Sequence, residues 1–419
     1  MRVASTRGAA SAPISEAIAQ GLATDGGLYM PPQLAPSARA WGTNLRERAL
    51  ALLMPYFADD PLADHLPAII DEAFNFDAPL RWLDERTALL ELFHGPTAAF
   101  KDFGARFLAA TLSRLTTGST ATVLVATSGD TGAAVASAFH GRPDFRVVIL
   151  YPEGRVSPRQ AHQLGAFGGN VHAFRVAGTF DDCQRMVKTA LADRELVARH
   201  HLTSANSISL GRLLPQMAYY AHAAMECAHA GHAPPSVIVP TGNLGNAFAC
   251  LLARERGLPI GKVMLATNAN RALVALAATG RYEPAATVAT LANAMDVGAP
   301  SNAERLLARF PQVRHAIDAD WVDDEAIGHA IRRTWDRHHV AICPHTACGV
   351  EVLERLRARG DRGTWIVAAT AHPAKFDTVV EPIIGTTVAV PEPLAELLAR
   401  PAHATPLPPE PAALARALA

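Results

Sequence analysis

The chain has 419 residues, and its 38 Lys and Arg residues nearly balance its 39 Asp and Glu residues, giving a formal net charge of −1. This balance, with no run of basic residues, excludes the positive field by which nucleic-acid-binding proteins attract their partners. Hydrophobic residues make up 49% and charged residues 18% of the chain, which excludes a disordered protein and, at this length, predicts two packed domains.

The sequence indicates neither a targeting segment nor a metal site. The first thirty residues lack an apolar core behind a basic start, and no stretch reaches the ~18 uninterrupted apolar residues of a membrane span. The five cysteines are scattered and odd in number, and the histidines of "CPHTACGV" and "TAHPAKF" have no second ligand at metal spacing. We therefore expect a cytoplasmic protein with reduced thiols, no metal and no membrane partner.

The order of predicted elements indicates an α/β protein with two lobes. Residues 1–90 have an irregular, mostly helical pattern that predicts a small N-terminal unit. From about residue 100, helical patterns alternate with short apolar runs, which predict strands at 121–127, 146–152, 170–176, 236–242, 262–268 and 364–370. Apolar strands separated by helices are typical of mainly parallel sheets covered on both faces. We expect a smaller lobe over 91–210, a larger lobe over 211–390 and a C-terminal tail over 391–419.

The turn after the strand at 121–127 reads "SGDTG", from Ser128 to Gly132, and opens a helix. Backbone N–H groups, the helix dipole and two hydroxyls meet at such a junction and can bind an anion. The same five residues fit an ordinary capped turn equally well. On its own, this turn leaves both interpretations open.

The strand at 236–242 runs into a second turn of this kind, "TGNLGN", from Thr241 to Asn246. It is not the G-x-G-x-x-G fingerprint of dinucleotide sites, and no acidic ribose ligand follows it. The turn therefore favours a phosphate ester the size of a mononucleotide over NAD. Glycine-asparagine turns are common in proteins, so an ordinary turn is the alternative.

Between the two lobes, "TSANSISLGR" places Ser204, Asn206, Ser207 and Arg212 close together in the sequence. Hydroxyl, amide and guanidinium groups of this kind suit a second phosphate or a carboxylate, which an arginine can bind with two hydrogen bonds. The alternative is a helix N-terminus followed by a surface arginine.

A single lysine, Lys101, stands among aromatic and small residues in "FHGPTAAFKDFG". Burial of an amine lowers its pKa and makes it a better nucleophile and base. The alternative is a lysine whose stem is buried and whose amine reaches water. A buried lysine together with a phosphate-binding turn is what a pyridoxal phosphate enzyme requires, and this combination favours the first interpretation.

Ten stretches in the same order resemble the threonine synthase family, in the tryptophan synthase β-like group of pyridoxal phosphate enzymes. They are "STRG", "GLATDGGLYMP", "FHGPTAAFKDFG", "ATSGDTGAAVASAF", "SANSISLGR", "PTGNLGNAFA", "ATNAN", "LANAMDVGAPSN", "PHTACG" and "TAHPAKF". The resemblance implies a fold-type II pyridoxal phosphate enzyme, in which each lobe has a mainly parallel sheet.

The resemblance also implies roles for individual residues. Lys101 is expected to form the Schiff base with the cofactor, with Asp130 near the phenolic oxygen and Thr370 near the pyridine nitrogen. The residues expected to hold the cofactor phosphate are Gly242, Asn243, Leu244, Gly245 and Asn246. The residues expected to hold the carboxylate and phosphate of the substrate are Thr127, Ser128, Thr131, Asn206, Ser207 and Arg212. Leu244 stands where relatives often have Phe, and Cys343 where Glu often precedes "PHTA".

The implied activity is that of a lyase of threonine biosynthesis, which converts O-phospho-L-homoserine and water to L-threonine and phosphate. The lobe that carries "SGDTG" is expected to move when substrate binds. Three alternatives remain: a related phospho-lyase that forms 2-oxobutyrate, ammonia and phosphate, a non-catalytic relative that binds phosphorylated amino acids, and a nicotinamide dehydrogenase, which the missing fingerprint disfavours. The resemblance allows a monomer or a homodimer.

Overall fold

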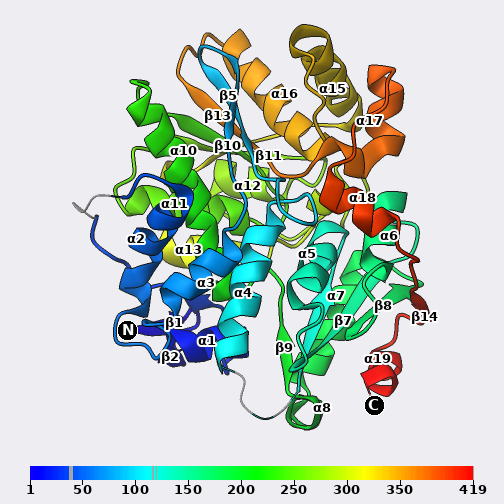
Figure 1. The fold of residues 1–419 in the computed structure, drawn as a ribbon. Coiled ribbons are helices and arrows are strands. Elements are labelled where there is room, and N and C mark those ends of the chain that lie inside the picture. The colour runs from blue at the N-terminus through cyan, green and yellow to red at the C-terminus, as the bar shows by residue number, and fades with distance from the viewer. Residues whose placement is uncertain (37–40, 116–117, 119, 419) are drawn as a thin grey trace.

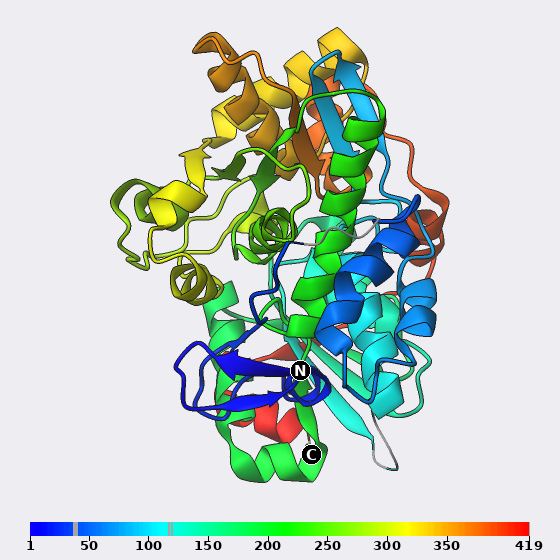
Figure 2. The same ribbon diagram turned by 90° about the vertical axis from the view of Figure 1, so that its left-hand side faces the viewer.

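Two mainly parallel sheets, one in each lobe, form the framework of the computed structural model (Figure 1). The structure describes residues 1–36, 41–115, 118 and 120–418. A small N-terminal unit packs beside both lobes (Figure 2). The predicted fold class is therefore confirmed. Within the described ranges, no helix is both long and apolar enough to cross a membrane.

The smaller lobe is built on a five-stranded parallel sheet, in the order β14-β8-β7-β6-β9. Its strands are β6 (Ala121–Ala126), β7 (Phe145–Pro152), β8 (Val171–Val176), β9 (Leu202–Ser204) and β14 (Thr405–Leu407). Its helices are α5 (Asp130–Phe139), α6 (Pro158–Gly165), α7 (Phe180–Ala192), α8 (Arg194–His200) and α19 (Pro411–Leu418). Because side chains alternate along a strand, Val123 and Val125 join the main core, whereas Leu124 packs in the cluster of α7 and α19.

The larger lobe has a six-stranded sheet, in the order β12-β11-β10-β13-β5-β4, in which only the edge strand β4 is antiparallel. Its strands are β4 (Leu80–Asp84), β5 (Thr87–Glu91), β10 (Ser236–Pro240), β11 (Val263–Thr267), β12 (Asp318–Trp321) and β13 (Trp365–Ala369). Its α-helices are α10 (Met217–His229), α11 (Gly245–Glu255), α12 (Ala272–Thr279), α13 (Ala303–Arg309), α14 (Val313–Ala316), α15 (Asp324–His338), α16 (Pro344–Ala358), α17 (Asp377–Ile384) and α18 (Glu392–Leu398). Two single 3-10 turns are η2 (Asn293–Met295) and η3 (Pro373–Phe376).

The N-terminal unit combines helices with a three-stranded antiparallel sheet, in the order β2-β1-β3. Its elements are β1 (Arg2–Ser5), β2 (Ser11–Pro13), α1 (Ile14–Gln20), β3 (Tyr29–Met30), α2 (Leu45–Phe57) and α3 (Leu66–Ala73). The prediction of a mostly helical unit missed this sheet, because strands of two to four residues are too short to show alternation. The remaining helical elements are α4 (Lys101–Leu115), α9 (Leu210–Leu213) and η1 (Leu214–Gln216), which pack against one another.

Two of the predicted segment limits need correction. Strand β5 pairs with β13, so residues 80–91 complete the sheet of the larger lobe and do not belong to the N-terminal unit. The C-terminal residues return to the smaller lobe, where β14 pairs with β8 and α19 lies beside α7 (Figure 1). Both strands extend their sheets by pairing with a strand that is distant in the sequence, and local patterns do not reveal such pairing. We therefore propose to count residues 80–91 with the larger lobe and 405–418 with the smaller one.

Candidate active site

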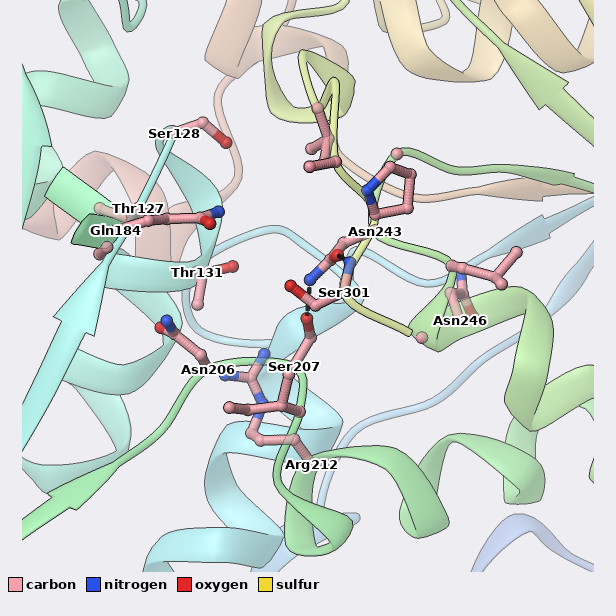
Figure 3. A pocket seen from close by; sticks show the side chains of 18 of the residues that line it. Thr127, Ser128, Thr131, Gln184, Asn206, Ser207, Arg212, Asn243, Asn246 and Ser301 are labelled. Carbon is pink, nitrogen blue, oxygen red and sulfur yellow. Dashed lines mark hydrogen bonds between the residues drawn. The ribbon is translucent and has the colours of Figure 1, made fainter. Parts of the chain in front are cut away.

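A cavity of about 550 Å³ lies between the lobes, where both predicted anion-binding turns meet the start of α4. All fourteen residues that the sequence predicts for the site line this cavity: Lys101, Thr127, Ser128, Asp130, Thr131, Asn206, Ser207, Arg212, Gly242, Asn243, Leu244, Gly245, Asn246 and Thr370. Figure 3 shows side chains of the smaller lobe on one side of the cavity and those of the larger lobe on the other. The structure thus brings together residues that are up to 269 positions apart, from Lys101 to Thr370.

Lys101 is the first residue of α4, and the end of β13 fixes its position. The Phe100 N–H donates to the Thr370 carbonyl over 2.9 Å, and Ala99 forms a bridge with Ala371. The Lys101 Nζ atom lies 5.1 Å from the centre of the Phe100 ring, and only 15% of the side chain is exposed. Burial lowers the pKa of Lys101 below its ordinary value, although the attraction of Asp130 opposes this. The structure therefore supports the interpretation of Lys101 as a desolvated amine.

The first turn, from Ser128 to Gly132, is held by the side chain of Thr127 and leaves little space around Gly129. The Thr127 hydroxyl oxygen accepts hydrogen bonds from the N–H groups of Gly129 and Gly132, over 3.0 and 2.9 Å. Gly129 has a φ of 134°, and a Cβ atom there would lie 2.5 Å from the Gln160 amide nitrogen. Thr127 thus shapes the turn, and only its hydroxyl hydrogen is left to donate to a ligand.

Asp130, at the start of α5, carries the negative charge of this turn. Its Oδ1 atom accepts from Lys375 Nζ over 2.8 Å and from Gln160 Nε2 over 2.9 Å, and its Oδ2 atom lies 3.8 Å from Lys101 Nζ. Burial alone would raise the pKa of Asp130, but the neighbouring amines, Lys375 foremost, hold it well below its usual range. The turn therefore presents a carboxylate, where many anion-binding turns present only N–H groups.

The second turn is strained and closely packed. Leu244 has a φ of +67°, and its N–H donates to the Thr241 hydroxyl over 3.1 Å. A Cβ atom on Gly242 would lie 2.8 Å from the backbone of Met295, so only glycine fits there. Helix α11 begins directly after this reversal, at Gly245, and the first N–H groups of a helix have no intrahelical acceptor. This is the backbone geometry of an anion cradle.

The two asparagines of the second turn use their side chains to hold the turn in place. Asn243 donates to the Ser207 hydroxyl and accepts from the Ser301 N–H, each over 2.6 Å (Figure 3). Asn246 accepts from the hydroxyls of Tyr219 and Tyr220, over 2.5 and 2.8 Å. The carbonyl-type oxygens are thus engaged with protein donors, whereas the buried Nδ2 atom of Asn246 has no partner in the described residues.

Arg212 is buried, with 1% of its surface exposed, which rules out the alternative of a surface arginine. One Nη atom donates to the Ala205 carbonyl over 2.5 Å, while the Nε atom has no partner in the described part of the chain. The buried Oδ1 atom of Asn206 is also without one. Burial lowers the pKa of Arg212 to about 10, which still leaves it cationic at neutral pH. Unpaired buried polar groups are costly, so a polar ligand is expected here.

His345, near the start of α16, is a cavity residue that the sequence analysis considered only as a metal ligand, and rejected as one. Its Nε2 atom accepts from the Ala294 N–H over 3.1 Å, and burial lowers its pKa to about 4, so the ring is neutral. Two residues earlier, Cys343 caps α16, because its sulfur accepts from the Thr346 N–H over 3.5 Å. This accounts for the unusual Cys343 as a helix cap. In the residues that the structure describes, no cluster of His, Cys, Asp or Glu could hold a metal ion.

Comparisons with known proteins identify this arrangement. A family described as pyridoxal-phosphate dependent enzyme matches residues 81–370, and the N- and C-terminal families of threonine synthase match residues 2–74 and 346–418. A threonine synthase from Serratia marcescens is 39% identical over 91% of this chain and 90% of its own length. The chain belongs to the threonine synthase family. The crystal structure of threonine synthase from Escherichia coli matches it with a TM-score of 0.94 at 36% identity, covering 100% of this chain and 99% of that one.

Membership in the threonine synthase family confirms the predicted family function of threonine synthase, the fold type and the cofactor, pyridoxal phosphate, but not the particular substrate. A pyridoxal phosphate-bound threonine synthase from Brucella melitensis matches with a TM-score of 0.89 at 35% identity and covers 100% of this chain and 98% of that one. The residues of the cavity fit such a group. The tight turn at Gly242 and Leu244 suits a phosphate, and the desolvated amine of Lys101 suits an aldehyde.

Several residues around the site escaped the sequence analysis. Arg7 and Lys188 line the cavity, and Lys375 reaches Asp130 from η3. Arg7 and Lys375 do stand in stretches that carry the family resemblance, "STRG" and "TAHPAKF". Lys375 also has the signal that revealed Lys101, a lone amine between apolar residues. Lys188 has no such signal, because it lies on an ordinary amphipathic helix.

Proposed function

We propose that this member of the threonine synthase family converts O-phospho-L-homoserine and water to L-threonine and phosphate. One observation carries the choice of substrate. A buried, cationic Arg212 with an unsatisfied Nε atom lines the same cavity as Lys101, and it comes from α9 and not from the turn at Gly242. The cavity thus offers an anion site beyond the one that the cofactor phosphate requires, as a phosphorylated substrate demands.

Lys101 is proposed to carry out the proton transfers. When bound, pyridoxal phosphate supplies an electron sink that stabilises negative charge beside the amine-bearing carbon of the substrate. An amine whose pKa burial lowers can accept the Cα proton, pass that proton on, then accept a Cβ proton, and can later return a proton to Cα. The phosphate leaves from Cγ, and the hydroxyl of water adds at Cβ. The three hydrogens released, from Cα, from Cβ and from water, go to Cγ, to Cα and to the departing phosphate, so that the atoms balance as threonine plus inorganic phosphate.

Arg212 is proposed to bind the phosphate that leaves. Its cation becomes more stabilising as negative charge accumulates on the departing oxygen, which lowers the barrier and not merely the free energy of the bound substrate. Ser128 and Thr131 are partly exposed at the cavity wall and have hydroxyls that could hold the substrate carboxylate. Asn206, with its unpaired Oδ1 atom, could accept from the substrate amine.

We also propose that the cavity closes over the substrate, because a neutral amine that transfers several protons needs water excluded. The groups that would approach each other are Ser128 and Thr131 on the smaller lobe and Asn243 on the larger one (Figure 3). A cytoplasmic location fits the five cysteines, which are all buried and unpaired. Sedimentation of the purified protein would decide between the monomer and the homodimer that the family resemblance allows.

Product analysis tests this proposal directly. Purified protein with pyridoxal phosphate is incubated with O-phospho-L-homoserine, and threonine, 2-oxobutyrate and phosphate are measured together. We expect threonine and phosphate in equal amounts. If 2-oxobutyrate dominates, the chain is a phospho-lyase, and if neither product forms, the proposed substrate is wrong.

A further inference from the structure

A second buried lysine, Lys375, lies next to the proposed catalytic amine and has no part in the reaction described above. The chain contains only four lysines, at positions 101, 188, 262 and 375. Lys188 and Lys262 are exposed, whereas Lys375 is 0% exposed in η3. Burying an amine costs free energy unless its charge is paired and its hydrogens are bonded. A buried lysine beside an active site therefore calls for a specific reason.

The contacts of Lys375 show where its charge goes. Its Nζ atom donates to Asp130 Oδ1 and to the Thr97 carbonyl, each over 2.8 Å. The backbone around it is held by the smaller lobe, because Ser157 donates to the Lys375 carbonyl over 2.7 Å and Arg159 donates to the Ala374 carbonyl over 2.6 Å. Lys375 is thus fixed against Asp130 from the opposite lobe.

Among the described residues, Asp130 is the one carboxylate that lies within 4 Å of either buried amine. Asp130 can balance one ammonium group, and the geometry decides which. Lys375 Nζ is at hydrogen-bond distance from Asp130, whereas Lys101 Nζ lies 3.8 Å away. A second proton, on Lys101, would leave a net positive charge in a desolvated place, which is unfavourable.

We propose that Lys375 is a positioning residue that takes up the charge of Asp130, so that the amine of Lys101 stays uncharged and free to react. This inference rests on the proposed role of Lys101, although its test does not require the cofactor. The proposal explains how the first turn can contain Asp130 without keeping the neighbouring amine of Lys101 protonated. Without Lys375, the carboxylate would hold a proton on Lys101.

The other charged and titratable groups around Lys101, Lys375 and Asp130 do not alter this balance of charges. Among those that face Lys101, His345 on α16 is neutral, because burial lowers its pKa to about 4. Arg212 on α9 is cationic and also disfavours a second positive charge at Lys101. Burial raises the pKa of Asp102 on α4 and that of the Cys343 thiol, which favours the neutral form of both. The Gln160 amide, which donates to Asp130, carries no charge.

The test measures how fast each lysine of the full, cofactor-free chain is acetylated by dilute acetic anhydride as a function of pH, with peptide mapping by mass spectrometry. Only the neutral amine reacts, so the pH midpoint for Lys101 reports its protonation. The exposed Lys262 serves as the internal reference in every sample. The variants are Lys375→Met, Asp130→Asn and the double variant, which removes the ion pair as a unit.

We expect a defined order of midpoints for Lys101. Lys375→Met should raise the midpoint by about one to three pH units, because Asp130 is left to pair with Lys101 alone. The double variant should return it toward the wild-type value, and Asp130→Asn should give a midpoint no higher than that of wild type, because no carboxylate is then left to hold a proton on Lys101. In cofactor-loaded protein, the pH midpoint of the visible absorbance should rise in Lys375→Met and return in the double variant.

Equal midpoints for wild type and a folded Lys375→Met variant would overturn the proposal, even if both variants lose activity. If Lys375→Met does not fold, Lys375→Gln, which keeps a hydrogen-bond donor without a charge, takes its place, and a midpoint equal to that of wild type overturns the proposal as well. If the role of Lys375 were merely structural, its replacement would lower stability but would not produce this order of midpoints. If the order holds but no threonine forms, the charge proposal stands while the proposed reaction fails.

Discussion

The two turns at the ends of β6 and β10 have the same local design and opposite electrostatics. Each follows a buried strand, contains glycines and opens a helix. The first places the Asp130 carboxylate at its helix start and needs Lys375 to balance it, whereas the second, from Thr241 to Asn246, has no charged side chain. The comparison shows that a glycine-rich turn alone does not determine an anion site. The charge inside the turn and the groups brought from elsewhere decide what it binds.

Lys101 lies between the two turns, and its loss should have the largest effect. Lys101→Arg keeps a positive charge but removes the primary amine, so we expect threonine formation to fall by at least ~10³-fold. The assay is threonine release by cofactor-loaded protein. Lys262→Arg, the same exchange at an exposed site, should retain full activity. If Lys101→Arg kept activity within tenfold of wild type, the Lys101 amine would not be the reacting group, and the two turns could not be compared by what they do for it.

Arg212 supplies the anion site that neither turn provides. Arg212→Met should lower kcat/KM for the phosphorylated substrate by about 10²-fold or more, because the developing negative charge loses its cation. Inhibition by inorganic phosphate should weaken in parallel. Arg212→Lys keeps the positive charge but loses the planar guanidinium group, so its kcat/KM should lie between those of wild type and Arg212→Met. Unchanged phosphate inhibition in a folded Arg212→Met variant would contradict this role.

His345 links the two turns, because it lies near Asp130 and accepts from Ala294 beside the second turn. Its pKa of about 4 in the folded protein lies below the ~6.5 of an unfolded chain, so the unfolded state binds more protons between these values. Stability should therefore rise with pH from about 4 to 6.5, with a contribution on the order of 3 kcal/mol from this group.

Urea unfolding at a series of pH values checks the contribution of His345. His345→Gln keeps a hydrogen-bond acceptor for Ala294 but does not titrate, so its unfolding free energy should vary less over this range. Asp130 contributes with the same sign but at lower pH, since its lowered pKa gives stability that is lost only as pH falls below the ordinary pKa of an aspartate, and it does so in both proteins. An identical pH dependence in the variant and in the wild type would refute the assignment.

Adding a single methyl group to the second turn, at Gly242, should weaken the binding of the cofactor. Gly242→Ala places a Cβ atom 2.8 Å from the Met295 backbone and should weaken cofactor affinity by roughly tenfold, about 1.4 kcal/mol. Equilibrium titration followed by absorbance measures this effect. Gly328→Ala in α15, where the nearest atom would be 3.8 Å away, is the matched control and should leave affinity unchanged. Equal affinities for all three proteins would show that the turn does not hold the phosphate.

Much of the fold and site followed from the sequence, because local patterns specify strands, turns and lone amines. The strands at 121–127 and 236–242 appeared within two residues of their predicted limits, and the site residues met in one cavity. The pairing of β5 with β13 and of β14 with β8 did not follow, since register between distant segments leaves no local pattern. Lys375 was missed for the same reason, because its partner Asp130 is 245 residues away.

The covalent bond expected at Lys101 tests the central claim most directly. Cofactor-loaded protein is reduced with borohydride, digested and mapped by mass spectrometry across all four lysines. The account predicts the reduced pyridoxyl phosphate adduct on the peptide that carries Lys101 and on no other. An adduct on Lys375, or none at all in protein that has bound the cofactor, would contradict it.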